Sequence, residues 1–218
     1  IKVNVTTESE SLQIDGNVAL LAIGVEGNIN NIGLQDIGVN SENGSISINN
    51  YCQTNISNIY AIGDVAGPPW LAHKASAQGH MVADLICGKS VHKVDYFNIP
   101  NCTYCQPQVA SLGLTESKAK DLGHNIKVGR FFFRASGKAM AVGNTFGFVK
   151  LIFDDRYGEL IGAHIIGDGA TEMIAELNIA KALESTWEDL AMTMHAHPTL
   201  SEAVMEAAMD AFGSAIHQ

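Results

Sequence analysis

Two short runs of apolar residues constrain the fold of this chain more than any other feature. The first, Val18 to Ile23, contains no polar residue and ends at Gly24, and the second runs from Ile59 to Asp64. A strand with one solvated face alternates polar and apolar residues, whereas a strand buried on both faces of a parallel sheet does not. We therefore predict a buried strand at each run, in an α/β fold.

A helix is predicted directly after the second run, because apolar residues recur at helical spacing from Leu71 to Ile86 and Gly88 provides a stop. Asp64 would then lie at the carboxyl end of a buried strand, where open α/β sheets bind ligands. An acid there accepts hydrogen bonds from sugar or polyol hydroxyls, and the helix N-terminus faces an electron-rich group. The ordinary alternative is a solvated acid at a strand end.

The pattern changes near residue 95, after which strands and helices occur in blocks typical of an α+β domain. Apolar residues on two of the predicted helices exceed what we expect one layer of strands to cover, which predicts a homodimer. These residues are Met173, Ile174, Leu177, Ala203, Val204, Ala207 and Met209. The predicted strands are 109–112, 126–134, 147–154 and 159–167, and the predicted helices are 115–122, 171–183, 186–194 and 199–212.

Charge and composition exclude several classes of partner. Thirteen Lys and Arg against 23 Asp and Glu give a net charge of −10, and no basic cluster occurs, which argues against nucleic acid or an anionic membrane. The apolar runs are too short to span a bilayer, and no basic and apolar leader opens the chain. Four cysteines are too few for a disulfide scaffold of this size. We therefore expect a soluble, cytoplasmic protein.

A second candidate site combines His195, His197 and Glu202 around Pro198. A carboxylate that holds one ring N–H sets the tautomer of a histidine and stabilises its imidazolium, which suits a general acid or base. Two alternatives stay open: Thr199 and Glu202 also match a helix capping box, and the histidines could be ordinary loop residues. A metal site would require a third ligand that the pattern lacks.

Cys102 and Cys105 form a C-x-x-C pair, yet their surroundings favour neither redox nor zinc chemistry. A thioredoxin-like pair begins a helix, whereas a strand is predicted here. A structural zinc requires two further ligands at matching spacing, and none is evident.

Two segments resemble motifs of the flavin-dependent pyridine-nucleotide disulfide oxidoreductases. Ile59 to Gly67, followed by Leu71 to Ala75, is similar to the second flavin motif of that family, and His195 to Glu202 is similar to its active-site motif. The form Leu71-Ala72-His73-Lys74 resembles the dihydrolipoamide dehydrogenases rather than the glutathione or mercuric reductases. The resemblance covers nearly the whole chain but only the C-terminal half or so of a family member, and the first residue, Ile1, agrees with a piece of a longer protein.

The resemblance implies three domains and a set of cofactor contacts. Residues 1–24 would end the NAD-binding domain, residues 25–94 would be the C-terminal part of the FAD-binding domain, and residues 95–218 would form the dimerisation domain. Asp64 would bind the ribityl chain of FAD. Trp70, Leu71, Ala72 and His73 would lie beside the flavin ring, and Gly24 would contact the nicotinamide nucleotide, although Val25-Glu26 departs from the arginines common in the family.

The resemblance also implies a catalytic role for His197, which would handle the thiol proton of dihydrolipoamide, oriented by Glu202, across the interface of a homodimer. Electrons would pass from dihydrolipoamide on the lipoyl domains of a 2-oxo acid dehydrogenase complex to a disulfide, to FAD and to NAD⁺. The phosphate-binding G-x-G-x-x-G and the redox disulfide do not occur in this sequence, so the chain alone is expected to be inactive. Two alternatives are a non-catalytic dimerisation module that binds no flavin and a related reductase with another disulfide substrate.

Overall fold

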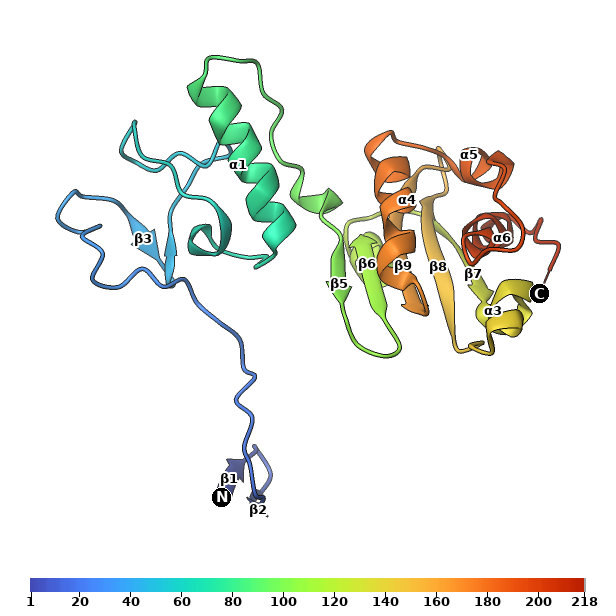
Figure 1. The fold of residues 1–218 in the computed structure, drawn as a ribbon, viewed down its shortest axis with the longest axis horizontal. Helices are drawn as coiled ribbons and strands as arrows, with labels where there is room; N and C mark the ends of the chain where they lie inside the picture. Colours follow the sequence, from blue (N-terminus) through green and yellow to red (C-terminus); the bar gives the residue numbers. More distant parts are fainter. Residues whose placement is uncertain (218) are drawn as a thin grey trace. The chain divides into compact units, whose positions relative to one another are not determined.

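The computed structural model of the chain describes residues 1–217 and divides into two compact units. Unit 1 is Ile1–His92, and unit 2 begins at Lys93 (Figure 1). Each unit has its own cluster of buried apolar residues. Within residues 1–217, no helix combines the length and the apolar character needed to cross a bilayer.

Unit 1 consists of short elements around a small apolar core formed by Val39, Ile46 and Ala61. Its longest element, α1, confirms the helix predicted after the second apolar run. Strand β1 pairs antiparallel with β2. The elements are β1 (Lys2–Thr6), β2 (Ser11–Asp15), β3 (Ser41–Glu42), β4 (Ser45–Ile46), a 3₁₀ helix (Gly63–Ala66) and α1 (Ala72–Ile86).

Both buried strands predicted from the apolar runs are wrong. Val18 to Ile23 is irregular and exposed, with Leu20 at 90% and Ile23 at 88%, because no strand of residues 1–217 pairs with it. Ile59 to Asp64 forms only an isolated bridge, between Gln53 and Tyr60. The chain then turns at Gly63, whose φ is 73° and whose N–H donates to the Gln78 side chain instead of a neighbouring strand.

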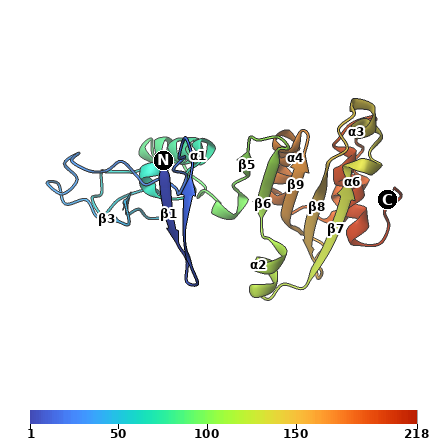
Figure 2. The ribbon, with the colours of Figure 1, turned by 90° about the horizontal axis from the view of Figure 1, so that it is seen from below.

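Unit 2 is an antiparallel five-stranded sheet in the order β5-β6-β9-β8-β7, which the labels of Figure 1 follow. Helices α4 and α6 contribute to the main core on one face, whereas α2 packs against Ile152 and Ile161 on the other (Figure 2). The strands are β5 (Asn101–Thr103), β6 (Val109–Gly113), β7 (Ile126–Phe132), β8 (Gly147–Asp154) and β9 (Leu160–Gly167). The helices are α2 (Glu116–Asp121), α3 (Gly137–Val142), α4 (Ala170–Ala182), α5 (Trp187–Met192) and α6 (Glu202–Ala211).

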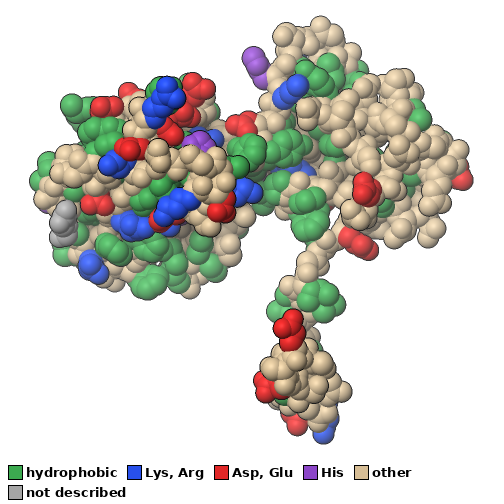
Figure 3. All heavy atoms as spheres, turned by 180° about the vertical axis from the view of Figure 1, so that it is seen from behind, with side chains coloured by type: hydrophobic (Ala, Val, Ile, Leu, Met, Phe, Trp, Pro, Cys, Tyr) green, Lys and Arg blue, Asp and Glu red, His purple; other side chains and the backbone are tan. Residues whose placement is uncertain are grey.

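The predicted strands and helices of unit 2 are all present, most with shifted ends, and the fold class is confirmed as mixed α/β, with an α+β arrangement in unit 2. Strand β5 and helix α3 were not predicted. The argument used for a homodimer is wrong, because the sheet covers the apolar faces of α4 and α6: Leu177 and Val204, for example, are fully buried. Other apolar side chains lie on the surface among the charged ones (Figure 3), including Phe97, Phe146, Ile179 and Met192.

Helix α6 lies unusually close to β7, and Gly129 permits this approach. A Cβ atom at Gly129 would lie 1.9 Å from the Ala207 carbonyl oxygen and 2.6 Å from the Ala211 nitrogen. The contact is extended by the Arg130 N–H, which donates to the Asp210 carboxylate at 2.8 Å. Any side chain at position 129 must therefore displace the helix.

We expect Gly129→Ala to lower the free energy of unfolding of unit 2 by about 2 kcal/mol or more, because the added methyl meets backbone atoms that have no room to move. The matched control is Gly137→Ala, since a Cβ at Gly137 meets nothing within 4 Å. The control should be neutral or slightly stabilising. Urea unfolding measures both variants, and equal effects would contradict the packing argument.

Candidate functional site

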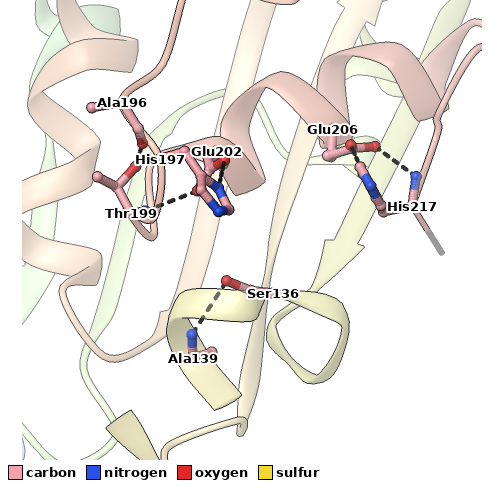
Figure 4. A network of polar contacts seen from close by, with 8 residues as sticks. All are labelled: Ser136, Ala139, Ala196, His197, Thr199, Glu202, Glu206 and His217. Atoms are coloured by element: carbon pink, nitrogen blue, oxygen red, sulfur yellow. Dashed lines mark hydrogen bonds and ion pairs between the residues drawn. The ribbon is translucent and has the colours of Figure 1, made fainter. Parts of the chain in front are cut away.

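The loop between α5 and α6 carries His195 and His197 on an irregular backbone. His197 Nδ1 lies 2.8 Å from Glu202 Oε1, at the start of α6 (Figure 4). The His197 side chain is 78% exposed, so solvent reaches its other ring nitrogen. The peptide bond between His197 and Pro198 is cis. The structure thus brings together the two residues that the sequence indicated as a general acid or base and its partner.

Glu202 also reaches back to the backbone, as a capping glutamate would. Its Oε2 accepts the Thr199 N–H at 2.8 Å while its Oε1 faces His197. In a full capping box the Thr199 hydroxyl would in turn accept the Glu202 N–H. Here the Thr199 hydroxyl instead donates to the Ala196 carbonyl oxygen at 2.7 Å (Figure 4). The two interpretations of Glu202 are therefore not exclusive, because each carboxylate oxygen serves one of them.

The surroundings of Glu202 favour its charged form. Burial alone would raise the pKa of its carboxyl, but hydrogen bonds from the Thr199 N–H and His197, and the charges of His197 and His195, outweigh burial and lower the pKa. A carboxylate at Nδ1 holds the proton on that nitrogen and leaves Nε2 as the basic atom. The arrangement can accept or return a proton at the surface of unit 2.

His195 differs from His197 although it stands only two positions earlier in the sequence. Its side chain is 5% exposed and turns inward, where Nε2 lies 2.7 Å from Glu176 Oε1 on α4. Nδ1 lies 2.9 Å from the Thr193 carbonyl oxygen. Sequence reasoning missed Glu176, because no local motif connects residues so far apart in the chain.

The candidate flavin-binding segment in unit 1 is held by a buried lysine. Lys74 is 1% exposed, and its Nζ donates to the carbonyl oxygens of Gly63 at 3.1 Å and Gly67 at 2.5 Å. Burial lowers the pKa of Lys74, and the charges of Asp64 and Cys52 partly offset this lowering. The 3₁₀ turn that presents the exposed Asp64 is thereby fixed to α1. Periodicity could have indicated Lys74, which shares the buried face of α1 with Gln78, Met81 and Val82.

The other predicted cofactor contacts of unit 1 lie at or near the surface. Trp70 is 41% exposed, Leu71 is half-buried, and Ala72 and His73 are exposed in the first turn of α1. The N-cap of α1 is Leu71, whose side chain provides no capping hydrogen bond to the first turn. Gly24 has a φ of 119° and open space where a Cβ would be.

The C-x-x-C pair does not begin a helix. Cys102 lies in β5, and burial raises the pKa of its thiol. The Cys105 thiol donates to the Pro107 carbonyl oxygen at 3.0 Å. Across residues 1–217, no group of three or more His, Cys, Asp and Glu side chains is placed to hold a metal ion.

Comparison with known proteins gives matches to both units. A family model described as pyridine nucleotide-disulphide oxidoreductase matches residues 1–79, and the model of the dimerisation domain of these proteins matches residues 99–208. A dihydrolipoyl dehydrogenase of Rhizobium etli is 49% identical over 97% of the chain and 44% of its own length. One from Bacillus subtilis is 44% identical over 100% of the chain and 46% of its own length.

Solved structures give the same result for the fold. LpdA from Mycobacterium tuberculosis superposes with a TM-score of 0.85 at 26% identity, covering 94% of this chain and 45% of that protein. The flavoprotein disulfide reductase RclA from Escherichia coli gives a TM-score of 0.84 at 23% identity, covering 95% and 48%. The chain thus spans less than half the length of the proteins that it matches.

The lowered pKa of Glu202 predicts a pH-dependent stability. Because the folded chain depresses this pKa, the charged carboxylate stabilises the fold above its unfolded value of about 4.3, and the effect is lost as the pH falls through the folded value. Glu202→Gln should therefore lower the free energy of unfolding by about 1 kcal/mol at pH 7, with the difference from wild type shrinking below about pH 4. Urea unfolding at several pH values measures it. A constant difference, or the same trend in exposed Glu172→Gln, would contradict this prediction.

Proposed function

This chain belongs to the pyridine nucleotide-disulphide oxidoreductase family, and on that premise we propose that it is the C-terminal part of a dihydrolipoyl dehydrogenase. The intact enzyme would oxidise protein-bound dihydrolipoamide with NAD⁺, through FAD and a redox disulfide. The length of the relatives supports this proposal, because each is more than twice as long as the segment that it shares with the chain.

The observation that carries the proposal is the pairing of exposed His197 with Glu202 at 2.8 Å. With its Nδ1 proton held by the carboxylate, His197 would accept the thiol proton of dihydrolipoamide at Nε2 as the thiolate attacks a disulfide. Glu202 would stabilise the imidazolium that forms. The substrate loses two electrons and two protons, and His197 handles the first of those protons.

We propose that Asp64 binds the ribityl chain of FAD and that Trp70, Leu71, Ala72 and His73 lie beside the flavin ring. The residues fit the group, because Asp64 is an exposed acceptor on a turn fixed by Lys74, and Leu71 places no capping side chain at the start of α1. When bound, FAD supplies the electron transfer to NAD⁺. Gly24 would contact that nucleotide, with residues 1–24 ending the NAD-binding domain, 25–94 in the FAD-binding domain and 95–218 forming the dimerisation domain.

The partners proposed are a second copy of the chain and, for the intact enzyme, the lipoyl domains of a 2-oxo acid dehydrogenase complex. The match of residues 99–208 to a dimerisation domain supports the homodimer, as do exposed apolar side chains such as Phe97, Phe146, Ile179 and Met192. All four cysteines are free thiols, which suits a reducing compartment, and we propose the cytoplasm.

The catalytic role is tested by fusing the N-terminal portion of the Rhizobium etli relative to this chain. Glu202→Gln should lower turnover of dihydrolipoamide with NAD⁺ by about 10²-fold or more, in line with what a positioned acid or base contributes, and His197→Ala should lose at least as much. Visible absorbance checks that each variant retains flavin. Glu172→Gln is the control. Full turnover by flavin-loaded His197→Ala would refute the proposal.

The chain by itself should bind FAD weakly or not at all. The sequence contains no G-x-G-x-x-G, the loop that holds a dinucleotide pyrophosphate at a helix N-terminus. Asp64 alone would contribute only ribityl contacts. We therefore expect a colourless protein after incubation with FAD and desalting, measured by visible absorbance. A yellow chain with stoichiometric flavin would contradict this expectation.

A further inference from the structure

The His195 side chain is buried, and both of its ring nitrogens face oxygen atoms. Nδ1 lies 2.9 Å from the main-chain carbonyl oxygen of Thr193, and Nε2 lies 2.7 Å from Glu176 Oε1. A carbonyl oxygen only accepts hydrogen bonds, so Nδ1 must carry a proton. The neutral imidazole has one N–H, and that proton is already committed to Thr193.

The contact with Glu176 therefore requires one further proton, on either Nε2 or the carboxyl group. We place it on Nε2, because a charged carboxylate is stabilised by water and by the N–H that it then accepts. The carboxylate keeps part of its hydration, since the Glu176 side chain is 33% exposed, whereas His195 is 5% exposed. The pair is then an imidazolium beside a carboxylate, with both N–H groups of the ring donating hydrogen bonds.

This pair anchors a loop that has no regular secondary structure of its own. Residues 193–201 connect α5 to α6, and the loop is attached to α6 by the contacts of Glu202 with Thr199 and His197. His195 attaches the same loop to α4, which packs on the opposite half of the sheet from α6. With both attachments in place, the backbone on each side of His197 is held.

We propose that His195 is a positioning residue, a buried imidazolium held by Glu176 that fixes the loop presenting His197. This inference rests on the proposed function in one respect, namely that His197 is the catalytic base. The charge of His195 also supports the second attachment of the loop, because it contributes to the lowered pKa of Glu202 and so favours the carboxylate that contacts Thr199 and His197. The charged groups that face the loop are thus Glu176 from α4 and Glu202 from α6.

Two substitutions of Glu176 separate the charge from the anchor. Glu176→Gln replaces the carboxylate by an amide whose N–H can donate to a neutral Nε2, so it keeps the attachment and removes the second ring proton. Glu176→Ala removes both. The control is Glu172→Ala, an exposed glutamate one turn earlier on α4.

The measurement is ¹⁵N NMR of the histidine side chains in the 218-residue chain near pH 7, with His195 assigned from His195→Asn. We expect both nitrogens of His195 to be protonated in wild type and only Nδ1 in Glu176→Gln. The Thr199 amide, which reports on the loop, should exchange with water about tenfold faster or more in Glu176→Ala and be little changed in Glu176→Gln and in the control. Circular dichroism checks that each variant is folded.

Two results would overturn the inference: an unprotonated Nε2 in the wild-type chain, or unchanged Thr199 exchange in folded Glu176→Ala. In the flavin-loaded fusion, Glu176→Ala should lower the turnover number more than it raises KM, because the anchor acts on the position of the base. If the fusion carrying His197→Ala stays fully active, that result refutes the proposed function but not the inference about His195. The NMR results concern the loop in either case.

Discussion

The backbone of α6 packs directly on the backbone of β7, and the polar contacts of the candidate active site depend on this approach. Gly129 makes it possible, since any Cβ there would overlap the helix. With α6 fixed on the sheet by Ala203, Val204 and Ala207, all fully buried, the half-buried Glu202 and the buried Glu206 have fixed positions. At the start of α6, Glu202 Oε1 contacts Nδ1 of His197. One turn later, Glu206 Oε1 lies 2.6 Å from Nδ1 of His217 (Figure 4).

The loop that follows α5 places two histidines of nearly adjacent sequence in opposite environments. The His195 side chain is buried and that of His197 is exposed, although side chains two positions apart share one face in a regular extended segment, so the opposite orientations reflect the irregular backbone of this loop. Each is held by a glutamate from a different helix. A loop without internal backbone pairing thus acquires definite geometry from side chains, and the base it presents is placed by the sheet through two helices.

The elements of unit 2 were predictable from the sequence because the apolar faces of its helices and strands pack against other elements of the same unit. Helix α4 shows this, since Met173 and Leu177 pack on the sheet that the neighbouring predicted strands form. The pairing of His197 with Glu202 was also accessible, because both lie in one local motif. Glu176 was not, because the fold alone brings it to His195.

The failures in unit 1 have a common physical cause. An apolar run such as Val18 to Ile23 shows that a segment favours burial, but it does not specify what covers it, and no strand of residues 1–217 does so. Lys74 shows the same dependence on what surrounds a residue. A lysine is expected at the surface, yet three backbone groups of one turn, the Gly63 and Gly67 carbonyls and the Gly63 N–H, require polar partners from α1, and Lys74 and Gln78 supply them.

The exposed run has a consequence for handling the chain and for its quality control in a cell. Six consecutive apolar residues without proline or charge form the kind of window that pairs with copies of itself into cross-β assemblies. Chaperones and proteases recognise such segments when they are accessible. Wherever the run is uncovered, aggregation and degradation compete with folding, so any segment that covers it would also protect the chain from both.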